Sequence, residues 1–118
     1  MNAAQLETII TKLPAAKLDY PFGPDVRVFK VMGKMFALIS ANNITTRITL
    51  KAHPADVEIL TSQFESIQPG YSMNKRHWIT IFLDQNCPIS LLPDMIQNSY
   101  DLVVEKLAKR DQMQLTQL

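Results

Sequence analysis

The 118-residue sequence contains little cysteine, little glycine and no long apolar run. Cys87 is its only cysteine, which excludes a disulfide bond within the chain. Its three glycines are too few and too scattered for a glycine-rich loop that cradles phosphate groups. The strongest apolar run, 35–39, is far too short to cross a bilayer, and the N-terminal residues lack the basic-then-apolar layout of a signal peptide. These absences predict a soluble cytoplasmic protein that does not associate with membranes.

The remaining composition is that of an ordinary globular protein. Apolar residues make up 47% of the chain and charged residues 19%. Single domains most often contain about 100–150 residues, and a domain of this size buries roughly two-thirds of its unfolded surface. We therefore expect one domain over residues 1–118, with a loose C-terminal tail over residues 111–118.

The net charge of +1 conceals an uneven distribution of charge along the chain. Residues 26–55 and 66–83 contain seven of the twelve cations and no carboxylate, which leaves five cations and all eleven acids for the rest of the chain. The seven cations are Arg27, Lys30, Lys34, Arg47, Lys51, Lys75 and Arg76. Such segregation says more about binding partners than the net charge does.

Hydrophobic periodicity and turn residues predict the order of the secondary structure. Helices are expected over 3–13, from Pro54 onward and over about 90–110, and strands over 26–31, 34–40, 46–52 and 77–83. These patterns leave open whether residues 67–73 form a further strand. Met32-Gly33 and Asn42-Asn43 fit tight hairpin turns because glycine and asparagine tolerate positive φ. Segment 34–40 is apolar enough to be buried on both faces.

This order predicts the fold class α+β. Strands that follow one another with helices segregated around them favour a two-layer domain, in which an antiparallel sheet carries its helices on one face. The other face of the sheet can then meet solvent. Strand 46–52 alternates, with Ile48 and Leu50 on one side and Arg47 and Lys51 on the other, so we expect the cations to lie on the open side.

Several motifs run through almost the whole chain in a fixed order. They are Tyr-Pro-Phe-Gly-Pro-Asp at 20–25, Val-Phe-Lys-Val at 28–31, Gly-Lys-Met-Phe-Ala at 33–37, Leu-Lys at 50–51, Pro-Gly-Tyr at 69–71, Met-Asn-Lys at 73–75, His-Trp at 77–78 and Ser-Tyr at 99–100. In these motifs the sequence resembles the MmcQ/YjbR family over about residues 14–107. The resemblance implies the order α-β-β-β-α-β-β-α, in a fold related in shape to frataxin-like and secretion-chaperone-like domains. Members of this family are small cytoplasmic bacterial proteins without an established activity, for which DNA binding through paired strand-and-loop wings has been suggested.

The candidate binding residues centre on the segment 71–78. Two fixed cations there precede the single tryptophan, a combination that suits phosphate contacts and stacking on a flat ring. For nucleic-acid binding we expect Arg47, Lys51, Lys75 and Arg76 to contact phosphates, with Asn74 and His77 as polar supplements. The alternative interpretation of Trp78 is a core residue, because it shares a strand face with Phe82. The strand lysines have an alternative role too, since charges protect sheets from edge pairing.

Catalysis and metal binding have less support in the sequence. Cys87 and His77 could pair only through folding, and a lone cysteine is more often a small buried apolar residue. No cluster of histidine, cysteine and carboxylate has metal-ligand spacing, and Glu7 is the only acid of the first helix, so the iron binding of frataxins does not carry over. We therefore predict no enzymatic activity and no cofactor.

A protein partner is the alternative to DNA. The secretion-chaperone likeness implies an open sheet face or edge that could accept a protein segment by strand addition. Methionines at 32, 35, 73 and 95 could add an adaptable apolar surface, although methionine more often fills cores. A small anionic ligand is a further alternative, and the chain is expected to be a monomer or a weak dimer.

Overall fold

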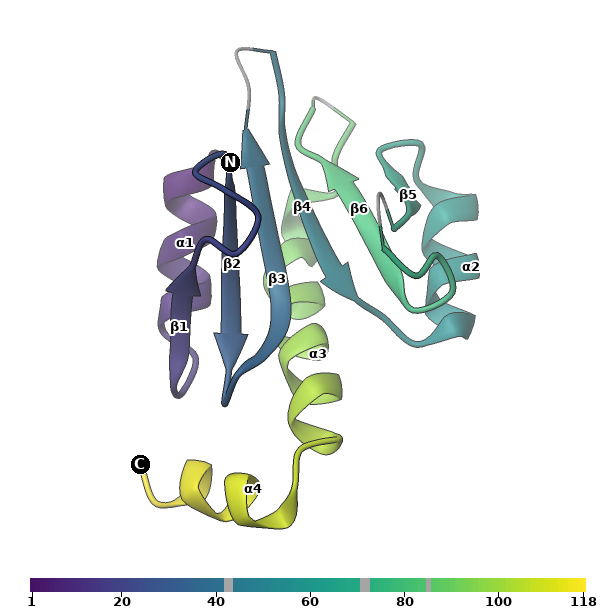
Figure 1. Ribbon diagram of the computed structural model, residues 1–118. Helices are drawn as coiled ribbons and strands as arrows, with labels where there is room; N and C mark the ends of the chain where they lie inside the picture. Colours follow the sequence, from purple (N-terminus) through teal and green to yellow (C-terminus); the bar gives the residue numbers. More distant parts are fainter. Residues whose placement is uncertain (42–43, 71–72, 85) are drawn as a thin grey trace.

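The computed structural model describes residues 1–41, 44–70, 73–84 and 86–118. Its helices are α1 (Ala3–Thr11), α2 (Pro54–Gln63), α3 (Leu92–Glu105) and α4 (Lys109–Thr116), with a 3-10 turn, η1 (Ile89–Leu91), before α3. Its strands are β1 (Ala16–Asp19), β2 (Val26–Val31), β3 (Lys34–Ala41), β4 (Thr46–Lys51), β5 (Ile67–Pro69) and β6 (Trp78–Phe82). The predicted α+β architecture is confirmed (Figure 1).

The strands form one antiparallel sheet in the order β1-β2-β3-β4-β6-β5. Met32 and Gly33 close the β2–β3 hairpin with φ values of 49° and 83°, as the sequence predicted for this turn. The predicted turn at Asn42-Asn43 lies outside the described residues. A bulge interrupts the β2–β3 pairing, because Lys30 pairs with Met35 while Phe29 pairs with Ala37.

The main core lies between the sheet and the helices, with α1, α2 and α3 on one face (Figure 1). Alternate strand residues point into it, including Ile48 and Leu50 of β4 and Ile79 and Ile81 of β6. The predicted stripe of the last helix is buried against them through Leu92, Ile96, Tyr100 and Val103 of α3, whereas Leu107, also predicted for this stripe, is buried just beyond the end of α3. Prolines open α2 and α3 in their first turns, where a missing N–H costs little.

A second, smaller apolar cluster lies on the opposite face of the sheet. Val28, Leu38 and Trp78 form it, and partly buried residues such as Met73 pack against it. The prediction that β3 is buried on both sides is thereby confirmed, since Leu38 faces this cluster while Ala37 and Ile39 face the helices. Trp78 is only 9% exposed, so of its two interpretations the core role is correct.

The structure corrects the sequence prediction at both ends of the chain. Strand β1 was not predicted, since it is a four-residue edge strand in which Lys17, Leu18 and Asp19 are exposed and no alternation is visible. The last helix does not run to residue 110 but ends at Glu105, and a separate helix, α4, occupies most of the expected loose tail. Gln112 holds α4 in place, because its Nε2 donates to the carbonyl oxygens of Val104 and Glu105 at the end of α3.

Candidate functional site

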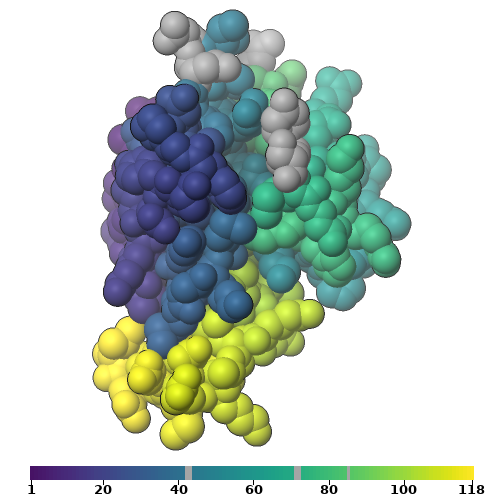
Figure 2. All heavy atoms as spheres, viewed as in Figure 1, coloured from purple at the N-terminus to yellow at the C-terminus, as the bar shows by residue number. Residues whose placement is uncertain are grey.

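The sheet face opposite the helices is hollowed between two raised segments. One is the connection 20–25 between β1 and β2, and the other is the segment 73–77 that leads into β6; both stand forward of the strands in Figure 2. Between them lies a cavity of about 300 Å³. Its apolar wall is formed by Phe22, Val26, Leu38 and Met73. We call this cavity, defined by its lining residues, the open-face pocket.

Three polar side chains complete the lining of the open-face pocket: Ser40 of β3, and Arg47 and Thr49 of β4. Thr49 is buried, and its hydroxyl group shares a hydrogen bond of 2.9 Å with that of Thr80 on β6. Thr49 and Thr80 are register partners, which is why the two hydroxyl groups meet on this face. The described lining therefore offers one cation, hydroxyl groups and an apolar wall, without a carboxylate.

The segment 73–77 is hydrogen-bonded to the backbone just after the end of β4. The Ala52 N–H donates to the His77 carbonyl at 2.9 Å, and Lys51 is the register partner of Trp78. The fold thus brings Lys51 close to the segment that carries Lys75 and Arg76, as the candidate site requires. Tyr71 and Ser72, the first residues of the segment singled out in the sequence, lie outside the described residues.

Asn74 has a structural task in this segment. Its Oδ1 accepts from the Arg76 N–H at 2.9 Å, and its carbonyl oxygen accepts from the His77 N–H at 3.2 Å. This turn holds Lys75 and Arg76 exposed, whereas His77 is half-buried. Asn74 therefore positions the two cations, besides its predicted role as a polar supplement.

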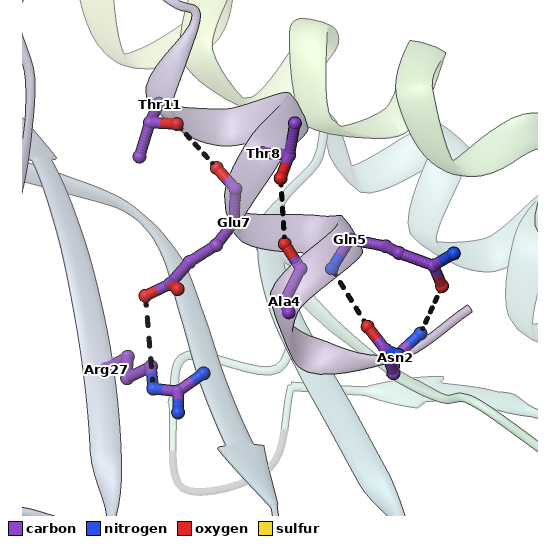
Figure 3. A network of polar contacts seen from close by, with 7 residues as sticks. All are labelled: Asn2, Ala4, Gln5, Glu7, Thr8, Thr11 and Arg27. Atoms are coloured by element: carbon purple, nitrogen blue, oxygen red, sulfur yellow. Dashed lines mark hydrogen bonds and ion pairs between the residues drawn. The ribbon is translucent and has the colours of Figure 1, made fainter.

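Not all cations of the acid-free strands belong to this face. Arg27 points to the helical side, where its Nε lies 3.9 Å from Glu7 of α1 (Figure 3). Lys30 lies on the open face, but its Nζ is 2.9 Å from Asp19 of β1. The hydrogen bond from Lys30 holds the pKa of the Asp19 carboxyl group below its usual range. The seven cations therefore do not all lie on the open face, and Lys30 is already paired with a carboxylate.

Two exposed aromatic residues were missed as site candidates. Phe22 is 59% exposed on the wall of the open-face pocket, and Tyr20 is 46% exposed in the same connection. The sequence did hold a signal for them, since a proline- and glycine-rich connection gives an aromatic side chain little core to enter. Thr49 was also missed, although the alternation of β4 placed it beside Arg47 and Lys51.

Cys87 and His77 belong to different parts of the molecule. Cys87 is buried in the main core, on the helical side, and His77 lies in the segment before β6. Burial raises the pKa of the Cys87 thiol, which is the opposite of what a nucleophilic cysteine requires.

The described residues contain no group of three or more histidine, cysteine or acidic side chains that could hold a metal ion. Nor do they include a helix with the length and apolar character needed to cross a membrane.

These observations define a two-layer α+β protein with a partly apolar, partly cationic hollow on the sheet face opposite its helices. The chain belongs to the YjbR family, whose model matches residues 11–102. It is 44% identical over 101 residues to the uncharacterized protein YbdF of Escherichia coli O157:H7, covering 86% of this chain and 83% of that protein. It is 30% identical over 89 residues to the uncharacterized protein YjbR of Escherichia coli K12, covering 75% of each chain.

Solved structures share the fold. A crystal structure of a Deinococcus radiodurans protein with a domain named DUF419 superimposes with a TM-score of 0.89 at 34% identity, covering 98% of this chain and 88% of the other. A crystal structure of a Pseudomonas syringae protein gives a TM-score of 0.73 at 31% identity, covering 86% of this chain and 98% of the other. The family predicted from the sequence motifs is therefore confirmed.

Proposed function

We propose that this protein binds nucleic acid through the sheet face opposite its helices. The observation that carries the proposal is that Lys51 of β4 adjoins the segment that bears the exposed Lys75 and Arg76, while Arg47 lines the open-face pocket together with Met73 of that segment. Strands β3, β4 and β6 contribute no carboxylate to offset them. A cytoplasmic location, which would give access to nucleic acid, is part of this proposal.

Each of the four cations is suited to a phosphate contact. Binding to phosphates releases condensed counterions, so the affinity should fall steeply as salt increases. Four contacts correspond to a slope of about −3 in a plot of log affinity against log salt concentration. Asn74 and His77 would support these contacts from within the same turn, through the hydrogen bonds described above.

A protein segment is the second candidate partner, and the apolar wall of the open-face pocket favours it. Phe22 and Met73 could receive a side chain of such a segment. Strand addition is less favoured, because both edge strands are short: β1 has four residues, and β5 has three and ends at Pro69. We rank this candidate second because it leaves Lys75 and Arg76 without a role.

The experiment compares two pairs of cations, each formed by a lysine and the arginine that follows it in the sequence. Fluorescence anisotropy with labelled oligonucleotides, single-stranded and duplex, measures affinity over a salt range of about 50–200 mM. Lys75→Ala combined with Arg76→Ala should weaken binding and flatten the salt slope by about 1.5 to 2. The matched control is Lys109→Ala with Arg110→Ala, an exposed pair at the start of α4, which Figure 1 places beyond the end of the sheet. It should leave the slope of the parent protein unchanged.

Two results would overturn the proposal. One is the absence of binding to either oligonucleotide at low salt. The other is an equal loss of affinity in the two double variants, because it would mean that any pair of surface cations serves and that the sheet face has no special part.

A further inference from the structure

We infer that the open-face pocket receives a single unpaired nucleobase, so that the protein prefers single-stranded to fully paired nucleic acid. This inference rests on the proposed function and adds the form of nucleic acid that is recognised. It follows from the size of the pocket, from the exposed phenyl ring at its wall and from the charge around it.

The size and lining of the pocket fit one flat ring. Its volume of about 300 Å³ is at the lower end of the range for ligand-binding pockets. Leu38 lies on the floor, on β3, while Phe22 and Met73 come from the two raised segments on either side. Apolar atoms thus line the pocket on several sides, where the faces of a base could pack.

Phe22 is the aromatic residue among the described residues that line the pocket. The residue is 59% exposed to solvent, although it lines a pocket with an apolar wall. An exposed phenyl ring gains from stacking on a base, and this stacking is largely independent of sequence because every base presents a π-face. Trp78, the aromatic residue that the sequence suggested for stacking, cannot take this role because it is buried against Val28 and Leu38.

The polar lining matches the remaining parts of a nucleotide. A hydroxyl group has one donor and two acceptor sites, so Thr49 keeps hydrogen-bonding capacity beyond its bond to Thr80. The hydroxyl groups of Thr49 and Ser40 could form hydrogen bonds with the polar edge of a base. The guanidinium group of Arg47 could meet the adjoining phosphate, or stack on the base. No carboxylate among the described lining residues would repel the phosphate.

Base pairing should prevent this binding. In a duplex the faces of the bases are stacked and their pairing edges are occupied, so a pocket that holds a ring between side chains can be filled only by an unpaired base. The phosphates remain available in both forms. Lys75 and Arg76 should therefore contribute to both, while Phe22 should contribute to single strands alone.

The test uses an oligothymidylate of about 12 nucleotides and the duplex that it forms with its complement. The single strand should bind more tightly than the duplex. Phe22→Leu should lower affinity for the single strand about tenfold or more and leave duplex affinity unchanged. Phe22→Trp should retain single-strand binding because it keeps a flat ring. Tyr20→Leu is the matched control, since Tyr20 is an exposed aromatic residue of the same connection but is not among the described lining residues.

A second measurement locates the base directly. Methyl NMR of Thr49 and Met73 should show ring-current shifts on addition of the oligothymidylate, and the same methyl groups should not shift with the duplex. Equal affinity for both forms, with the salt slope intact and no effect of Phe22→Leu, would overturn this inference and leave the proposed function standing. Absence of binding to both forms would overturn the two together.

Discussion

The hydroxyl group of Ser99 donates a hydrogen bond of 2.6 Å to the carbonyl oxygen of Phe36. The same Ser99 oxygen accepts a hydrogen bond of 2.8 Å from the backbone N–H of Lys51. Phe36 is the extra residue of the β3 bulge, and Lys51 is the last residue of β4. One fully buried serine of α3 therefore satisfies two backbone groups at places where strand pairing is interrupted or ends.

Replacing Ser99 with alanine should lower the free energy of unfolding by about 2–3 kcal/mol, because it leaves a buried carbonyl and a partly buried N–H without their partner. Urea denaturation followed by circular dichroism measures the change. Ser62→Ala is the matched control: its hydroxyl group donates to the Ile59 carbonyl on the exposed side of α2, so the change should stay within about 0.5 kcal/mol. Equal values for the two variants would contradict the structural role of Ser99.

The parts of the fold that could be predicted are those in which a repeating pattern is long enough to be recognised. In β4, alternation correctly placed Ile48 toward the helices and Arg47 on the opposite face. The motif Ser-Tyr at 99–100 helped to identify the family, but nothing in its spacing reveals that Ser99 bonds to Phe36. That contact joins residues far apart in the chain and depends on a bulge that the sequence does not signal.

The candidate site also combines features that local sequence patterns reveal with features that depend on the fold. Lys75 and Arg76 could be selected as candidates because they are adjacent in an acid-free stretch, and the fold brings Lys51 close to their segment. The open-face pocket could not be predicted, because it requires Phe22 and Met73, from two different connections, to stand on either side of Leu38. Their positions around Leu38 depend on the order of the strands in the sheet, which cannot be read from local sequence patterns.

A second prediction concerns the close approach of Gly70 to Trp78. The Gly70 N–H donates to the Trp78 carbonyl at 2.6 Å, and a Cβ atom on Gly70 would lie 2.6 Å from the Trp78 Cβ. Gly70→Ala therefore forces the backbone to shift, and we expect a loss of about 1–3 kcal/mol of stability. Because Trp78 is the only tryptophan, its fluorescence should shift to longer wavelength as the small cluster loosens.

Gly33→Ala separates this clash from other effects of replacing glycine. Its added Cβ atom would have nothing within 4 Å, although the φ of +83° makes the substitution strained. This variant should lose about 1 kcal/mol of stability without changing the tryptophan emission. An unchanged emission maximum in Gly70→Ala as well would show that the contact with Trp78 does not constrain position 70.

A third prediction concerns stability at alkaline pH and follows from Tyr100. Its hydroxyl group donates to the Pro14 carbonyl at 2.7 Å, and its ring lies edge-on to Phe36 with a centroid distance of 5.3 Å. Burial, with a smaller effect from the neighbouring Asp101 carboxylate, raises the pKa of Tyr100 above its ordinary value of 10.0. The folded state thus favours the neutral phenol.

The sign of the pH dependence follows directly. Below about pH 10 both the folded and the unfolded chain hold the proton, so the contribution of Tyr100 to stability is complete. As the pH rises further the unfolded chain loses its proton first, and stability falls until the pH passes the pKa of the folded state. Tyr100→Phe should be less stable by about 1 kcal/mol at neutral pH, from loss of the hydrogen bond, but should lose less stability between about pH 9 and 11.

Urea denaturation at a series of alkaline pH values measures this difference. Burial also raises the pKa of the Cys87 thiol, so part of the alkaline loss belongs to Cys87. That part is present in both proteins and cancels when Tyr100→Phe is compared with its parent. Tyr20→Phe, which removes the hydroxyl group of an exposed ring, is the matched control and should keep the alkaline slope of the parent. An identical slope in Tyr100→Phe would mean that the buried phenol does not limit stability at high pH.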